Sequence, residues 1–154
     1  MKRRSFLKGS LGASAMAVAV GAGLLNPRQA LAAWPKAAFD AKSVPDALND
    51  LVGTGVTSPS SDITIKAPDI AENGAVVPVT ISTSLPNVAS ISVFAEKNAN
   101  PLAASFDLAS NAKGFVSTRI KMAKTANVVA AIKSGGKVYS ARKEVKVTIG
   151  GCGG

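Results

Sequence analysis

The 154-residue sequence contains no histidine and a single cysteine, Cys152. Histidine is the side chain that most often performs acid–base catalysis and binds metals near neutral pH, so its absence excludes histidine-based triads and the common zinc and facial-triad iron sites. One cysteine cannot form a CxxC pair, a haem-attachment motif or an internal disulfide. The sequence also contains no phosphate-binding GxxxxGK[ST] or strand-led GxGxxG motif. We therefore expect neither a catalytic site of the common types nor a cofactor in this chain.

The first 32 residues carry five of the 18 Lys and Arg residues and none of the nine Asp and Glu residues. Arg3 and Arg4 begin the segment RRSFLK, which matches the twin-arginine export motif at every specified position. The apolar stretch that follows, residues 11–25, is shorter than the roughly 20 residues that a spanning helix needs. The small residues at 30–32 (ALA) fit a cleavage site. We predict a signal peptide over residues 1–32 and a periplasmic mature chain that is not attached to the membrane.

A short amphipathic helix is predicted near the start of the mature chain. Ser43 and Asp46 have the spacing of a capping box, in which side chains bond the free N–H groups of the first turn. Leu48, Leu51 and Val52 then fall on one helical face, and a glycine follows as a stop signal. We expect this helix to pack on the main body and assign it no chemistry.

From Ile63 onward the sequence changes to an alternation of apolar and polar residues, which predicts strands with one buried and one exposed face. The clearest runs are 77–82, 90–93, 119–122 and 145–149. Turn-forming residues separate the runs, and the pair Gly135-Gly136 predicts a hairpin. About seven short strands in roughly 90 residues, without helical spacers, predict an all-β, immunoglobulin-like antiparallel β-sandwich. With the short N-terminal helix, this domain is expected to cover residues 33–149.

Charge is distributed unevenly along the mature chain. Residues 33–112 carry four cations and eight acids, whereas residues 113–154 carry nine cations and one acid. Two interpretations of the basic residues remain open. They can be solvated side chains on exposed strand faces, which is the simpler interpretation for any single lysine, or they can form a basic half of the domain that attracts anions or an acidic protein partner. Nucleic acid is not an expected partner, because the few aromatic residues do not interleave with the basic ones as a stacking surface requires.

The C-terminal motif carries the strongest functional signal. The chain ends in Gly150, Gly151, Cys152, Gly153 and Gly154, directly after the last predicted strand. Glycine lacks a Cβ and gives the backbone its widest freedom, so we predict a flexible arm over residues 150–154 that bears the only thiol. An ordinary thiol, with a pKa of about 8.5, is only slightly ionised at pH 7, and glycines cannot activate it. Activation must come from a partner's pocket, which is typical of a covalent carrier whose cargo is attached to Cys152.

This motif resembles that of the SoxY family, the sulfur-carrier subunits of the bacterial thiosulfate-oxidising Sox system. Three internal stretches agree with the family: AENGAVVPV at 71–79, NANPL at 98–102 and STRIKM at 117–122. The twin-arginine signal agrees as well, so the resemblance covers essentially the whole chain.

The resemblance implies an immunoglobulin-like sandwich, a periplasmic location and a heterodimer with a SoxZ subunit. It also implies that Cys152 carries the sulfur substrate covalently and that separate enzymes perform the chemistry. A c-type cytochrome, SoxAX, would join thiosulfate oxidatively to the thiol, and the hydrolase SoxB would then release sulfate. Where a sulfane dehydrogenase, SoxCD, is present, it would oxidise the remaining sulfur.

Two other functions stay open at this point. A β-sandwich adaptor without carrier function would use the same fold. A ubiquitin-like sulfur carrier also ends in Gly-Gly, but its C-terminal thiocarboxylate is made by ATP-dependent adenylation, and the periplasm offers no ATP. That function would also leave Cys152 unexplained.

Two further uses of a lone cysteine do not fit the sequence. Prenylation requires cysteine at the fourth position from the end, and here it is the third. A thiol oxidoreductase would need a second, resolving cysteine.

Overall fold

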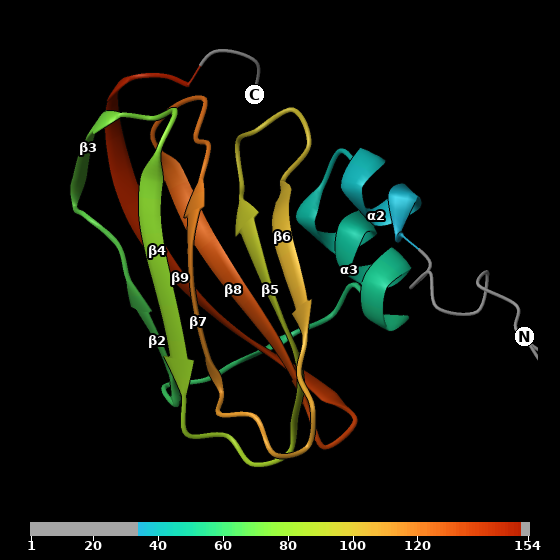
Figure 1. Ribbon diagram of the computed structural model, residues 1–154. Helices are drawn as coiled ribbons and strands as arrows, with labels where there is room; N and C mark the ends of the chain where they lie inside the picture. Colours follow the sequence, from blue (N-terminus) through green and yellow to red (C-terminus); the bar gives the residue numbers. More distant parts are fainter. Residues whose placement is uncertain (1–33, 152–154) are drawn as a thin grey trace, which may run out of the picture. The chain divides into compact units, whose positions relative to one another are not determined.

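The computed structural model, shown in Figure 1, describes residues 34–151. The predicted signal peptide with Arg3 and Arg4, and the residues Cys152, Gly153 and Gly154, lie outside the described residues. No helix in the described range is long and apolar enough to cross a membrane. Two helices precede a series of strands: α2 (Lys36–Asp40), α3 (Val44–Val52), β1 (Ser58–Pro59), β2 (Ile63–Lys66), β3 (Ile70–Asn73), β4 (Val77–Thr83), β5 (Val88–Ala95), β6 (Leu102–Asp107), β7 (Phe115–Ile120), β8 (Ala126–Ser134) and β9 (Lys137–Ile149).

The strands form two sheets. The larger sheet has the order β1-β9-β8-β5-β6, with β3 also paired to β9, and the smaller sheet has the order β2-β4-β7. The predicted hairpin joins β8 to β9, and Gly135 and Gly136 both adopt the positive φ angles that a two-residue hairpin turn requires. The all-β, immunoglobulin-like sandwich predicted from the sequence is thereby confirmed.

Two hydrophobic cores hold the layers together. The larger core lies between the sheets and includes Val79, Ile81, Ile91 and Val93. The smaller core joins helices α2 and α3 to the other face of the larger sheet, where Phe94 is buried. Figure 1 shows the two helices beside strands β5 and β6. The part of the larger sheet that packs against the helices is therefore covered on both faces.

This double coverage corrects the prediction of one exposed face for β5. Ser92 was expected on that exposed face but is only 2% exposed, and Ser90 is also buried. Both residues belong to β5, which is covered on the helix side as well as the sandwich side. The Ser92 hydroxyl is satisfied by a hydrogen bond of 3.0 Å with the Ser105 hydroxyl, so its burial leaves no polar group unpaired.

Helix α3 agrees with its prediction. Ser43 is the N-cap, and its hydroxyl oxygen accepts a hydrogen bond of 3.2 Å from the backbone N–H of Asp46. The helix ends at Gly53, which adopts the left-handed conformation. Leu48 is buried in the smaller core, so the helix packs on the body as expected. The five-residue helix α2 was not predicted, and its N-cap, Pro35, makes no side-chain capping bond.

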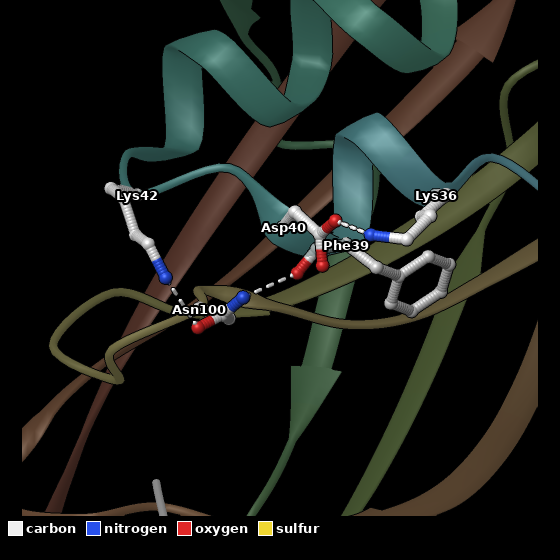
Figure 2. Close-up of polar contacts among 5 residues, drawn as sticks. All are labelled: Lys36, Phe39, Asp40, Lys42 and Asn100. Atoms are coloured by element: carbon white, nitrogen blue, oxygen red, sulfur yellow. Dashed lines mark hydrogen bonds and ion pairs between the residues drawn. The ribbon is translucent and has the colours of Figure 1, made fainter.

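Asn100 connects the helices to the turn between β5 and β6, as Figure 2 shows. Its side-chain amide donates a hydrogen bond of 2.7 Å to the backbone carbonyl of Phe39. Its side-chain oxygen accepts one of 3.0 Å from the Lys42 ammonium group. The β5–β6 turn is thereby held against the end of α2 and the segment that follows it.

The sandwich is not wholly antiparallel. Strands β1 and β3 both pair parallel to β9, whereas the other strand pairs are antiparallel. The 13-residue β9 extends beyond its partner β8, and β3 pairs with this extension at Ile70 and Asn73. The last strand before the glycine motif is therefore fixed by pairing along its final residues.

Candidate functional site

The candidate site is the C-terminal motif, of which the structure describes Gly150 and Gly151. A ladder of three hydrogen bonds surrounds these two residues. Gly74 donates its N–H to the carbonyl of Ile149 at 2.7 Å, and Met122 donates to the carbonyl of Gly74 at 2.7 Å. Gly151 then donates to the carbonyl of Met122 at 3.0 Å. The backbone is therefore held up to the residue directly before Cys152.

Close packing accompanies these bonds. A Cβ atom added to Gly150 would collide with the carbonyl oxygen of Ala123. One added to Gly151 would lie 2.8 Å from the Gly74 oxygen, closer than real Cβ contacts allow, and 3.0 Å from the Ala75 Cα, which is also a tight contact. Gly151 is accordingly buried. Here glycine serves the close approach of two backbone segments.

The prediction of a flexible arm over 150–154 therefore needs a correction at its first two residues. Gly150 and Gly151 are packed against Gly74, Ala75 and Ala123 and belong to the folded domain. The sequence could not separate the two uses of glycine, because conformational freedom and close packing both favour a residue without a side chain.

Asn98 supports the segment on which Gly151 rests. Its side-chain amide donates a hydrogen bond of 2.8 Å to the Lys121 carbonyl, and its side-chain oxygen accepts one of 2.9 Å from the Ala123 N–H. These two bonds bracket Met122, whose side chain is fully buried in the larger core. Sequence reasoning placed Asn98 in a family-like stretch but gave it no role, because its partners are more than 20 positions away.

The family-like stretches thus meet at one end of the sandwich. The β3–β4 turn, the β5–β6 turn, the segment after β7 and the end of β9 lie together at the upper end of Figure 1. Gly74, Asn98, Met122 and Gly151 come from these four segments, one from each, and are connected by the hydrogen bonds described above. The sequence indicated the stretches, and the strand register brings them together.

A cavity of about 390 Å³ lies at the same end. It is lined by Asn98, Asn100, and residues 102–103 and 119–121. Arg119 and Lys121 contribute the charged groups of the lining, and no carboxylate is among these residues. Within the described range, no group of three or more His, Cys, Asp or Glu side chains could hold a metal ion.

Comparison with protein families gives a match over residues 48–152 to the family described as "Sulfur oxidation protein SoxY". The chain belongs to the SoxY family. The match spans the sandwich and ends at Cys152, so the packed glycines and the cysteine lie within the part that the family shares.

A solved structure agrees with this membership. The sulfur carrier protein SoxY from Chlorobium limicola f thiosulfatophilum is 49% identical, with a TM-score of 0.60, and the match covers 68% of this chain and 94% of that one. A superoxide reductase (neelaredoxin) from Ignicoccus hospitalis is 20% identical, with a TM-score of 0.49, covering 55% of this chain and 79% of that one. This second similarity has no bearing on function. A comparison with curated proteins gives no match.

Proposed function

We propose that this SoxY family member is a covalent sulfur carrier in thiosulfate oxidation and that Cys152 is the attachment point. The observation that supports this proposal most strongly is that the only cysteine of the sequence lies in an intact GGCGG motif. This motif follows a domain that is 49% identical to a sulfur carrier protein. Because the sequence has no histidine and no second cysteine, the chain brings no resident base or resolving thiol of the usual kinds. The chemistry is therefore assigned to partner enzymes.

The loading step is an oxidation that needs an electron acceptor. The Cys152 thiol and thiosulfate form Cys–S–S–SO₃⁻ with release of one proton and two electrons, and a c-type cytochrome of the SoxAX kind takes the electrons. Water then cleaves the terminal S–S bond under a SoxB-like hydrolase, giving a cysteine persulfide and hydrogen sulfate. Where a SoxCD-like dehydrogenase is present, the remaining sulfur is oxidised further.

The packed glycines give the carrier a fixed point of attachment. Under this proposal, the cargo is attached one residue after Gly151, whose backbone N–H is bonded to the Met122 carbonyl. A short tether restricts the volume that the thiol searches and so raises its effective concentration at a partner docked to this end of the sandwich.

The proposed setting is the periplasm, with export by the twin-arginine route and a SoxZ-like subunit as the stable partner. RRSFLK at residues 3–8 supports the route. The family membership supports the proposal of a SoxZ-like partner.

Mass spectrometry of the protein from thiosulfate-grown cells tests the proposal. We expect sulfur adducts on Cys152 that a reductant removes and that are absent from a Cys152→Ser variant, since a hydroxyl cannot form the disulfide-like bond. Modification at the Gly154 carboxylate would instead support the thiocarboxylate route. An unmodified chain that still binds its partner would support the adaptor function.

A further inference from the structure

We propose that Asn73 is a deamidation site and that the hydrogen-bond ladder at Gly151 controls the rate of its reaction. Asn73 and Gly74 form the only Asn-Gly pair in the sequence, and they lie where β3 ends and the turn to β4 begins. Asparagine is a thermolabile residue, and glycine after it leaves the side-chain amide least shielded, because glycine has no Cβ. The site is independent of the proposed function, because Cys152 takes no part in it.

The reaction forms one covalent bond and breaks another. The Gly74 backbone nitrogen loses its proton and attacks the side-chain amide carbon of Asn73, and the amide nitrogen leaves with one added proton as ammonia. Water then opens the cyclic imide. Opening at the side-chain carbon gives aspartate with an ordinary backbone. Opening at the backbone carbonyl carbon gives isoaspartate, in which the chain runs through the former side chain and gains one carbon.

The fold occupies both groups that must react. The Gly74 N–H donates a hydrogen bond of 2.7 Å to the Ile149 carbonyl, so the proton that must leave is held in the ladder. The Asn73 side-chain oxygen accepts a hydrogen bond of 2.9 Å from the Ala75 N–H, which fixes the orientation of the amide. Gly74 is buried, whereas Asn73 is exposed to water. We therefore expect deamidation to be slow until the bond between Gly74 and Ile149 opens.

The carrier motif holds Gly74 from its other side. The Gly74 carbonyl accepts a hydrogen bond from Met122, whose own carbonyl accepts one from Gly151. A Cβ on Gly151 would lie 2.8 Å from the Gly74 oxygen and 3.0 Å from the Ala75 nitrogen, so a side chain there must displace the turn. Because the N–H of the displaced Gly74 is the group bonded to Ile149, a disturbance at Gly151 is expected to free the reacting nitrogen.

The two products should act differently on the ladder. Asn73 pairs with Ile149 across β3 and β9. Isoaspartate lengthens the backbone by one carbon directly before Gly74, so the Gly74 N–H loses its register with the Ile149 carbonyl. Aspartate keeps the ordinary backbone and a side-chain oxygen that can accept from Ala75. Only isoaspartate is therefore expected to release the start of the carrier motif.

Incubation of the purified protein at mildly alkaline pH tests the site. Peptide mapping by mass spectrometry measures conversion at Asn73, and chromatography separates aspartyl from isoaspartyl peptides. We expect conversion in the folded wild type to be at least about tenfold slower than in the same chain unfolded in guanidinium chloride. Gly151→Ala should speed conversion in the folded protein by about tenfold, since overpacking at that position favours opening of the ladder.

Phe94→Ala is the control for global unfolding. Phe94 belongs to the smaller core, which contains none of the ladder residues, so this change lowers stability without disturbing the ladder directly. Conversion at Asn73 in folded Phe94→Ala should stay near that of wild type. Faster conversion in Phe94→Ala than in Gly151→Ala would show that global unfolding exposes the site, and the control by the ladder would be wrong. Equal conversion in folded and unfolded wild type would overturn it as well.

Hydrogen exchange at the Gly151 amide tests the effect of the products. Asn73→Asp reproduces the aspartyl product and should exchange at the wild-type rate. Protein enriched in isoaspartate by chromatography should exchange about tenfold faster at the same amide. If the isoaspartyl form exchanged as slowly as Asn73→Asp, deamidation would not release the carrier motif.

Discussion

Gly74 and Gly151 approach so closely that neither can carry a side chain without displacing the other. A Cβ on Gly74 would lie 2.8 Å from the Gly151 nitrogen, and a Cβ on Gly151 would lie 2.8 Å from the Gly74 oxygen. Met122 bonds to both residues through its N–H and its carbonyl. The start of the carrier motif, at Gly151, is therefore built into the sandwich.

Gly151→Ala should destabilise the domain. The added methyl group forces the backbones of residues 74 and 151 apart, and overpacking of this kind costs about 1–3 kcal/mol. Chemical denaturation should show the loss, and hydrogen exchange should show faster exchange at the amide of residue 151.

Gly153→Ala is the matched substitution on the other side of Cys152. Under the carrier proposal it should slow loading by a partner enzyme while the unfolding free energy stays near that of wild type. If Gly151→Ala and Gly153→Ala both had the same unfolding free energy as wild type, the close packing at Gly151 would not contribute to the stability of the domain.

Asn98→Ala should loosen the segment that holds Gly151. The change leaves the Lys121 carbonyl and the Ala123 N–H without their partner, and each lost hydrogen bond costs about 0.5–1.5 kcal/mol. We expect faster hydrogen exchange at Ala123 and Gly151.

Asn100→Ala provides the control, because it removes a similar side chain whose bonds run to Phe39 and Lys42 on the helix side. It should lower stability without changing exchange at Gly151. Equal effects of both variants on that amide would show that Asn98 acts through global stability and does not position the motif.

The sequence predicted those features that depend on local chemistry. The Ser43 cap, the stop at Gly53 and the turn at Gly135-Gly136 are all determined by residues close in the chain. The sequence does not predict the burial of Ser92, because that burial depends on helices that end 40 or more positions earlier. The ladder at Gly151 was missed for the same reason, since Gly74 and Met122 reach it only through the register of β3, β4 and β7.

Phe94→Ala should show that the second face of the larger sheet is a true core. Phe94 is fully buried between that sheet and the helices, and removing such a ring costs about 3–5 kcal/mol. Phe115→Ala is the control, because the Phe115 side chain is 55% exposed. It should change the unfolding free energy by about 0.5 kcal/mol or less. Similar losses in the two variants would contradict the packing of α2 and α3 on this face.

Export by the twin-arginine route can be tested by substitutions at Arg3 and Arg4. Replacing Arg3 and Arg4 by lysines keeps the charge of the first segment and changes only the guanidinium groups. If a twin-arginine system reads the motif, the variant should remain in the cytoplasm with residues 1–32 attached, as cell fractionation and the mass of the intact chain would show. Arg28→Lys is the control, because it makes the same exchange outside RRSFLK and should leave export unchanged. Normal periplasmic yield of the double-lysine variant would mean that the positive charge alone is sufficient, and the twin-arginine assignment would be wrong.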